Sequence, residues 1–246
     1  MLAQSLWASL ALSACGRLGY DLREAVATVP ASMTVDTPCG AAAPAVDVPI
    51  TNDGPDPLWV MDASATGGFV VQSVMPIVIA AGESAMLQVR SPDAVIGTDR
   101  AGSQKLSTLT ITTNALATPT VEVALVATVI GADLAASDVN GQALTNLDLM
   151  GTTTLCPIQL VTIANTGNAP ATILIATSTD FGISGFAGGV IDASSNETFA
   201  LKANTAGPCT GAGQLTYTAT GDVCSATPVI LQATFTITGG SSCSCS

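Results

Sequence analysis

The sequence lacks histidine and is poor in basic and aromatic residues. Its 246 residues include six Lys or Arg, and aromatic side chains make up 4% of the chain. Histidine is the commonest general base in enzymes and a common ligand of zinc and iron. The net charge of −12 leaves no basic surface with which to release counterions from nucleic acid. We therefore expect no nucleic-acid binding, no metal site and no cofactor.

Other catalytic arrangements are poorly supplied as well. A serine nucleophile without histidine needs a buried lysine base, and the two lysines, Lys105 and Lys202, lie on or beside threonine-rich stretches. Carboxylate pairs that hydrolyse sugars need a cleft with aromatic side chains, whereas two Trp, two Tyr and five Phe are spread over the whole chain. We expect that the protein is not an enzyme.

The chain is rich instead in apolar and turn-forming residues. It is 48% hydrophobic and 10% charged, with 23 Gly and 13 Pro, a balance that is not typical of disordered chains. In residues 108–112 and 121–127 polar and apolar side chains alternate. Period-two alternation with many β-branched residues predicts short strands with one buried face. The length suits two domains.

The N-terminus predicts export. An apolar stretch over residues 6–12 leads into Leu12-Ser13-Ala14-Cys15, which resembles the lipobox of bacterial lipoproteins. The resemblance implies a signal peptide over residues 1–14 and a lipid on the Cys15 thiol, so that the membrane is contacted through the lipid anchor only. No Lys or Arg precedes Arg17, unlike the usual signal. Because Gly16 replaces the aspartate of inner-membrane retention, the resemblance implies the outer membrane.

Six cysteines remain once Cys15 carries lipid, and an even number in an exported chain predicts structural disulfides. Their pairing does not follow from the sequence. A soft metal on Cys243-Ser-Cys245 is the alternative, although none of the spacings is C-x-x-C. The six are Cys39, Cys156, Cys209, Cys224, Cys243 and Cys245.

The sequence repeats once. Residues 50–60 read ITNDGPDPLWV and residues 163–173 read IANTGNAPATI. Further matches follow at a nearly constant interval, and the interval changes only between strand-like stretches, where loops tolerate insertions. These matches are Phe69 with Phe181, Val78-Ile79 with Val190-Ile191, and Leu109-Thr110-Ile111-Thr112 with Leu215-Thr216-Tyr217-Thr218.

The order of these segments resembles the immunoglobulin-like family called ASH or Hydin-type, known in bacteria as the choice-of-anchor D domain. The segments are the Asn-Thr-Gly knuckle, an Ala-Pro strand start, a Phe, a turn at residues 81–85, Leu-Thr-Ile-Thr and Pro-Thr-Val. The resemblance implies an all-β chain of two tandem immunoglobulin-like β-sandwiches of about seven strands each. The expected domains are 30–131 and 140–238, with a tether at 15–29, a linker at 132–139 and a Cys-containing tail at 239–246.

The implied sandwich also suggests one disulfide. In such a fold the second and sixth strands begin at the same end, which favours a Cys156–Cys209 bond in the second copy. Cys224 belongs to the last hairpin turn at the opposite end. Cys39 occupies the matching place in the first copy without a partner there, which leaves it to pair with the tail cysteines or to stay a free thiol.

Two kinds of polar site remain to be interpreted. Asn52 and Asn165 either contact a carbohydrate or calcium ion, or cap their own turns, and turn chemistry is the favoured interpretation. Asp53, Asp56 and Asp62 form an acidic cluster with a weak calcium-site pattern. Around the expected linker, D-x-N-G faintly resembles the start of a calcium loop but lacks the terminal glutamate; its acidic and amide residues are Asp133, Asp138, Asn140 and Asp148.

The sequence therefore predicts a non-catalytic, lipid-anchored cell-envelope protein. As the main interpretation, it is a structural or adhesive module that binds an envelope or extracellular protein or glycan through its immunoglobulin-like domains. The alternative is an accessory or assembly component of an envelope complex that pairs through an exposed edge strand. The identity of the partner does not follow from the residues.

Overall fold

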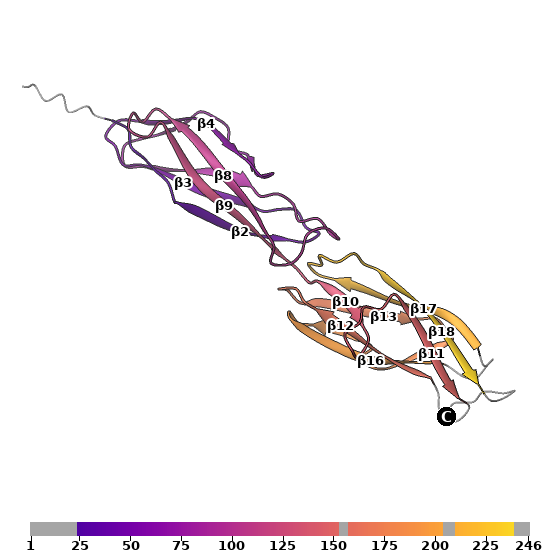
Figure 1. Ribbon diagram of the computed structural model, residues 1–246. Coiled ribbons are helices and arrows are strands. Elements are labelled where there is room, and N and C mark those ends of the chain that lie inside the picture. Colours follow the sequence, from indigo (N-terminus) through magenta and orange to yellow (C-terminus); the bar gives the residue numbers. More distant parts are fainter. Residues whose placement is uncertain (1–23, 153–156, 204–209, 239–246) are drawn as a thin grey trace, which may run out of the picture.

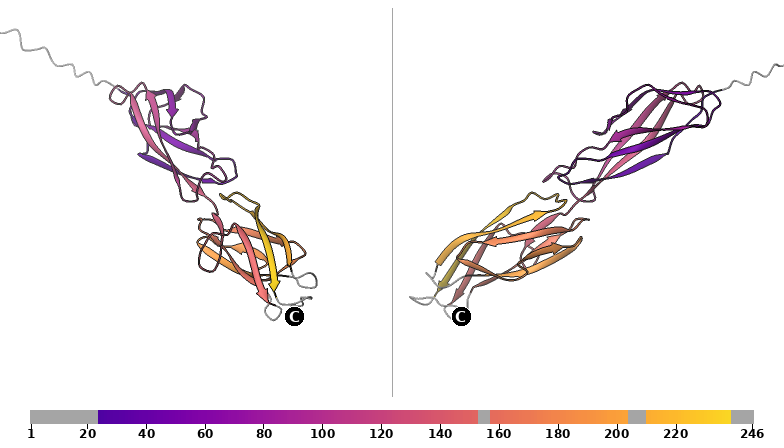
Figure 2. Two further views of the ribbon diagram at one scale, coloured as in Figure 1. Left: turned by 45° about the vertical axis from the view of Figure 1, so that its right-hand side comes forward. Right: turned by 180° about the vertical axis from the view of Figure 1, so that it is seen from behind.

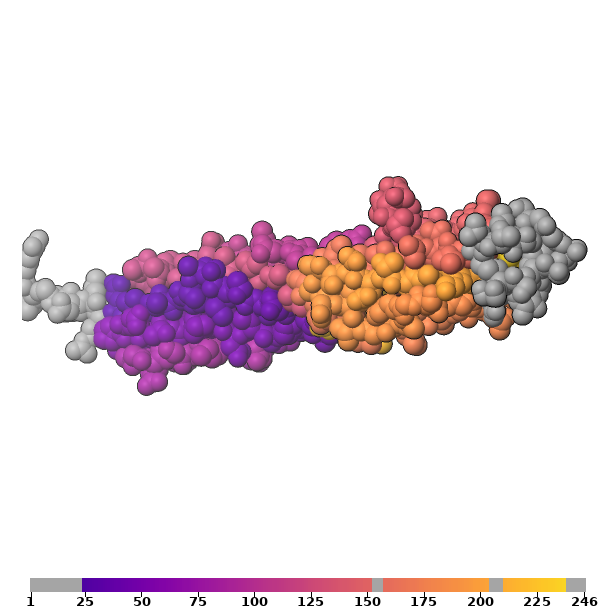
Figure 3. Space-filling model, turned by 90° about the horizontal axis from the view of Figure 1, so that it is seen from below, coloured from indigo at the N-terminus to yellow at the C-terminus, as the bar shows by residue number. Residues whose placement is uncertain are grey.

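The computed structural model describes residues 24–152, 157–203 and 210–238. These residues form two β-sandwiches placed end to end, as Figure 1 shows. The views of Figure 2 and the space-filling view of Figure 3 show the same elongated arrangement. The prediction of an all-β chain with two tandem immunoglobulin-like sandwiches is confirmed. The expected lipid site at Cys15 and the cysteines Cys156, Cys209, Cys243 and Cys245 lie outside the described residues.

The first sandwich packs a four-stranded sheet, in the order β1-β3-β7-β5, against a five-stranded sheet, in the order β2-β9-β8-β4-β6. Its strands are β1 (Ala27–Thr28), β2 (Ser32–Pro38), β3 (Ala45–Asn52), β4 (Leu58–Ala65), β5 (Val70–Val71), β6 (Ile77–Ile79), β7 (Ser84–Arg90), β8 (Gln104–Thr113) and β9 (Thr120–Ile130).

The second sandwich repeats this topology strand for strand. Its sheets have the orders β10-β12-β16-β14 and β11-β18-β17-β13-β15. Its strands are β10 (Leu134–Ser137), β11 (Asn146–Thr152), β12 (Ile158–Asn165), β13 (Ala171–Thr177), β14 (Phe181–Gly185), β15 (Gly188–Ile191), β16 (Ser195–Ala203), β17 (Thr210–Thr220) and β18 (Val229–Thr238). A hairpin closes each domain, β8–β9 in the first and β17–β18 in the second.

Each described sandwich has nine strands rather than about seven. In the first domain the difference comes from short strands: β1 and β5 have two residues each and β6 has three, too few to show a period. In addition, the entering chain contributes to both sheets, because β1 pairs with β3 while β2 pairs in parallel with β9. In the second domain β10 and β11 are divided in the same way.

The domain boundaries also differ from the expected ones. Residues 132–139 were expected as a linker, but they contain β10, which pairs with β12 over four residues. The expected tether at 15–29 contributes β1 to the first domain. No spare linker therefore separates the sandwiches, since β9 ends at Ile130 and β10 begins at Leu134.

Each sandwich has its own apolar core, built from the inward half of the alternating strands. Val, Ile, Leu and Ala supply most of the first core. The second core also takes in the fully buried Phe199 and Tyr217, and the rings of Phe181 and Phe235 meet edge to face with centroids 5.7 Å apart. Among the described residues there is no helix long and apolar enough to cross a membrane.

Candidate functional site

The two knuckles, residues 52–57 and 165–170, are the turns that connect β3 to β4 and β12 to β13. Asn52 and Asn165 are buried, and among the described residues each side chain bonds to backbone groups and to no other side chain. The Asn52 amide donates to the carbonyls of Asp56 (2.8 Å) and Ile79 (3.1 Å), and its oxygen accepts from Gly54 (3.1 Å). Asn165 likewise accepts from Gly167 (3.0 Å) and donates to Ala169 (2.8 Å). These contacts match the turn interpretation and leave neither side chain facing a ligand.

The glycine of each knuckle packs against the segment that enters the domain. A Cβ added at Gly54 would overlap the Glu24 carbonyl, and one at Gly167 would overlap the Gly131 carbonyl. In the second domain the entering segment is also the connection from the first domain. The second knuckle is therefore part of the joint between the sandwiches.

Asn168, in the second knuckle, binds both sides of this connection. Its side-chain oxygen accepts from the Gly131 N–H (2.8 Å), and its amide donates to the carbonyl of Val129 (3.1 Å) at the end of β9. Its own N–H donates to the Gly131 carbonyl (2.9 Å). The backbone and side chain of Asn168 together bond to Val129 and Gly131, so the last strand of one domain is fixed to a corner of the next.

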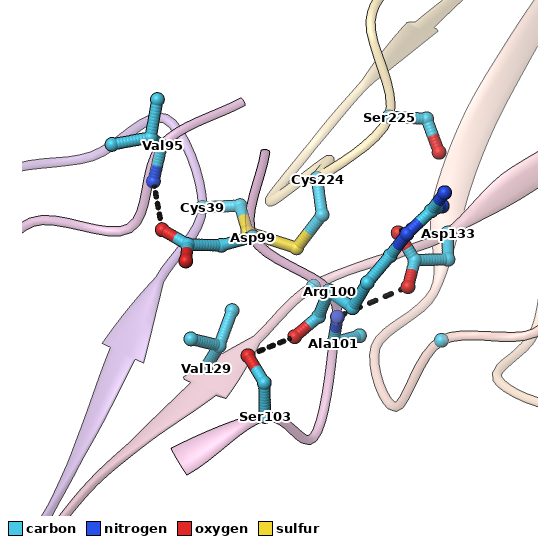
Figure 4. Close-up of a disulfide and its surroundings, with 12 residues drawn as sticks. Cys39, Val95, Asp99, Arg100, Ala101, Ser103, Val129, Asp133, Cys224 and Ser225 are labelled. Carbon is cyan, nitrogen blue, oxygen red and sulfur yellow. Dashed lines mark hydrogen bonds and ion pairs between the residues drawn. A yellow bond between two sulfur atoms is a disulfide. The ribbon is translucent and has the colours of Figure 1, made fainter. Parts of the chain in front are cut away.

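A disulfide crosses the same joint. Cys39, just after β2, bonds to Cys224 in the β17–β18 turn, with a Cα–Cα distance of 5.1 Å and 185 residues between them in sequence. Figure 4 shows the bond beside Val129 and Asp133. Cys224 lies in the last hairpin turn as predicted, whereas both alternatives predicted for Cys39, a bond to a tail cysteine and a free thiol, are wrong. The proposed Cys156–Cys209 bond lies outside the described residues.

The disulfide is enclosed by residues from both domains. Cys39, Cys224, Ala94 and Val129 form a small buried cluster apart from the two main cores. Gly131 lies against it, because an added Cβ would come within 2.5 Å of the Cys224 sulfur. Backbone bonds between Ala132 and the turn at 222–224 complete the joint. The oxidising environment expected from export is what such a bond requires.

A buried carboxylate holds the other side of the joint. Asp133 accepts the Ala101 N–H (3.0 Å) on its Oδ2, while the Arg100 guanidinium lies 3.7 Å from Oδ1 (Figure 4). Oδ1 is buried and accepts no hydrogen bond in the described part of the chain. Because a guanidinium already faces this oxygen, the carboxylate joins the loop of the first domain to the second domain rather than offering a cation site.

Charged pairs order the loop between β7 and β8, residues 91–103, which reaches the joint between the two domains. Lys105 donates to Asp99 (2.8 Å) and to the Asp93 carbonyl (2.7 Å). Hydrogen bonds from Lys105, then from the Val95 N–H, hold the pKa of the Asp99 carboxyl below its ordinary range. The pKa of Asp93 is lowered chiefly by the Ala43 N–H and then by Arg90. Lys105 is thus engaged in an ion pair.

The acidic residues singled out in the sequence do not converge. Asp53 accepts from the Thr28 hydroxyl, Asp56 offers its carbonyl to Asn52, and Asp62 lies on the exposed face of β4. Within residues 24–152, 157–203 and 210–238, no three or more His, Cys, Asp or Glu side chains gather where they could hold a metal ion.

The residues around the expected linker are also separated. Asp138 caps a turn by accepting from the N–H groups of Asn140 and Gln142, first from Gln142, which lowers its pKa. Asp148 accepts from Thr234 on the neighbouring strand, and Asp133 lies at the joint. The D-x-N-G pattern is therefore an aspartate-capped turn.

Sequence reasoning missed the joint as a feature. One signal was available: Cys224 lies in the predicted last hairpin turn, and Gly131 stands at the predicted domain boundary. The pairing depends on how the two domains meet, however, which strand periodicity does not encode.

No protein-family model matches the chain, and no curated protein matches its sequence. Solved structures match it by shape. A protein of unknown function from Porphyromonas gingivalis W83 has a TM-score of 0.33 at 10% identity, covering 85% of this chain and 99% of that one. The Pseudomonas aeruginosa CupB2 chaperone has a TM-score of 0.32 at 11% identity, covering 84% and 98%. At these TM-scores the likeness does not bear on function.

The extracellular cadherin domains 1–4 of protocadherin gamma B7 match with a TM-score of 0.50 at 9% identity. The match covers 88% of this chain and 51% of the protocadherin chain. At that identity the similarity concerns the fold alone, which is a tandem arrangement of β-sandwich domains.

Proposed function

We propose that the protein is a non-catalytic, protein-binding component of the cell envelope. Its two domains act as a stiff rod that presents an open sheet edge to an extended segment of a partner. The joint supports the rod, because a disulfide, a buried carboxylate and the Asn168 contacts all connect the two domains. The open edge supports the binding mode.

The edge strand β11 is the observation that carries the proposal. It pairs with β18 over seven residues on one side, and the described residues place no strand on its other side. Leu147 and Leu149 are buried and fix the strand to the core, whereas the Met150 side chain is 83% exposed. The strand contains neither proline nor lysine, the residues that commonly protect sheet edges from pairing.

The corresponding edge of the first domain is less open. The strand β2 also pairs with its neighbour over seven residues, but it ends in Pro38 and leads directly into the joint at Cys39. By contrast, β11 runs toward the end of the second domain that faces away from the first domain (Figure 1). A partner strand added there would gain main-chain hydrogen bonds without disturbing the joint.

Export, the lipid on Cys15 and membership of the choice-of-anchor D type of immunoglobulin-like domain belong to the proposal as well. They rest on the lipobox-like Leu12-Ser13-Ala14-Cys15 and on the repeated knuckle. Metabolic labelling with a clickable fatty acid is expected to tag the wild type and not Cys15→Ala. Equal labelling of both would contradict the anchor.

Edge pairing is tested with a charge placed on the edge. Met150→Lys should lower the yield of partner in a crosslinked pulldown from intact cells, because lysine on an edge opposes strand addition. Leu174→Lys is the matched control, since Leu174 is 67% exposed on β13, an inner strand of the same sheet. If Met150→Lys captures the same proteins in the same yield as Leu174→Lys, β11 is not the binding edge.

Protease shaving of intact cells separates this assembly role from adhesion. An adhesive module is cleaved from intact cells, whereas a component that faces the periplasm is cleaved only after the outer membrane is opened.

A further inference from the structure

Four large apolar side chains are exposed together at the end of the first domain where the chain enters. Trp59, Met61, Val78 and Leu116 are 47%, 49%, 54% and 73% exposed. Trp59 lies opposite Val78 across the β4–β6 pair. Its backbone also exchanges hydrogen bonds with Asn114, two residues before Leu116. These four side chains, with Asp62 and Glu122 described next, are called the Trp59 patch.

An irregularity in β4 shapes this patch. The register of β4 against β8 shifts between Val60 and Asp62, so Met61 is an extra residue in the strand. As a result both Met61 and Asp62 are exposed on the outer face, whereas regular alternation would turn one of them inward. Bulges of this kind commonly re-aim side chains next to binding sites.

The charge around the patch is of one sign. Asp62 is paired with Thr112 across the β4–β8 pair. Glu122 is paired with Thr110 across the β8–β9 pair, and Thr110 and Thr112 both face outward on β8. Three of the four described Lys and Arg residues belong to the first domain, and all three form ion pairs within or beside residues 91–103, the loop that reaches the joint at the other end of the domain. No cation of the described chain therefore neutralises the patch.

The second domain provides a comparison. Its β13 strand pairs in regular register without a bulge, so Leu174 alone stands where the first domain has both Met61 and Asp62, and Val190 stands where it has Val78. Thr172 stands where the first domain has Trp59, and Ile230 stands opposite Thr216 where the first domain has Glu122. This face of the second domain is apolar but carries neither the tryptophan nor the two carboxylates, so the acidic aromatic surface is specific to the first domain.

We propose that the Trp59 patch binds an extended segment of a partner protein in which Lys or Arg alternates with apolar side chains. The basic groups would pair with Asp62 and Glu122 and stack on the Trp59 ring, which attracts cations to its face. The apolar residues would cover Met61, Val78 and Leu116. This surface is separate from β11 and lies at the opposite end of the rod, so it goes beyond the proposed function.

Charge argues for a protein segment rather than a lipid surface. Tryptophan is frequent at membrane interfaces, but Asp62 and Glu122 would be repelled by anionic headgroups. A basic segment gains attraction from the same two carboxylates.

The test is a fluorescence titration of the full chain carrying Trp7→Phe, in which Trp59 is the one tryptophan left. An acetylated peptide of alternating arginine and leucine should change the Trp59 emission with saturation, and more weakly as salt is raised. Asp62→Asn combined with Glu122→Gln should weaken binding about fivefold, as expected for exposed ion pairs. Met61→Ser should also weaken it, whereas the matched control Leu174→Ser should bind like the parent protein.

Other outcomes overturn the proposal. Equal binding of an alternating aspartate–leucine peptide would show that charge plays no part. An emission change with phosphatidylethanolamine and phosphatidylglycerol vesicles, but not with the arginine peptide, would identify a membrane surface. If the double substitution Arg17→Gln and Arg23→Gln changes the Trp59 emission in the absence of peptide, the chain's own N-terminal segment is the occupant of the patch.

Discussion

At the scale of single residues, the same amide side chain performs the same task twice. Asn52 and Asn165 each bond to backbone groups at both ends of a corner, and the glycine two positions later leaves room for the entering segment. A recurring polar residue is thus explained by backbone hydrogen bonds that a buried corner must satisfy. The turn interpretation was available from the sequence because asparagine followed closely by glycine has a known backbone use. The clamping of the entering chain was not.

Asn165→Ala is expected to lower the free energy of unfolding of the second domain by about 2–3 kcal/mol. The substitution leaves the Ala169 and Asp192 carbonyls and the Gly167 N–H without their partner, and each buried group that loses its bond costs about 1 kcal/mol or more. Denaturant unfolding measures the change. Asn196→Ala, at an exposed position, should stay within about 0.5 kcal/mol of the wild type, and similar losses for both variants would refute the corner role.

Asp99 should titrate at a lower pH than an ordinary aspartate. Its charged form accepts hydrogen bonds from Lys105 and Val95, so its pKa is lowered in the folded chain. The stabilisation is therefore present above the ordinary aspartate pKa of about 3.9 and is lost as the pH falls through the lower folded value. Carboxyl NMR titration would show this, and Lys105→Gln should move the midpoint upward. An unchanged midpoint in that variant would mean that Lys105 does not hold the carboxylate.

At the scale of elements, the period-two stretches of the sequence became strands, and the two copies share one topology. The late hairpins followed from residues 108–112 and 121–127 because long strands carry enough alternating positions to define a face. The strand β5 has two residues and shows no period, so the strand number was underestimated. Residues 134–137 read LAAS, a weakly alternating stretch that looks like a linker. It becomes β10 only because the edge of β12 is beside it.

The strand β10 should behave as part of the second sandwich in hydrogen exchange. The N–H and C=O groups of Leu134–Ser137 pair with β12 in antiparallel register, so those amides that face β12 should be protected. We expect them to exchange far more slowly than the exposed amides of Ala117 and Thr118 in the β8–β9 turn. Exchange of β10 amides as fast as these two would show that the segment is a linker after all.

At the scale of the whole molecule, the two domains are connected more tightly than their sequence boundary suggests. Cys39 and Cys224 lie at the facing ends of different domains, 185 residues apart in sequence. The repeat shows which cysteines share a domain but not which ends of the two domains meet, and the predicted Cys156–Cys209 bond accordingly lies within one domain. The basic residues of the first domain also gather at the joint, which leaves the entry end acidic. The rod thus has a different surface at each end and a fixed connection between them.

The disulfide is expected to fix the relative orientation of the domains. In the wild type, residual dipolar couplings from both domains should fit a single alignment tensor. In Cys224→Ser the backbone bonds of Ala132 and Asn168 remain, but the contact between Cys39 and the β17–β18 turn is lost. Two tensors of different magnitude should then be needed, because the second domain turns about the short connection after β9. Cys39→Ser, and reduction of the wild type, should give the same result. If one tensor still fits both Ser variants, the hydrogen bonds of the joint are sufficient, and the disulfide does not set the geometry of the rod.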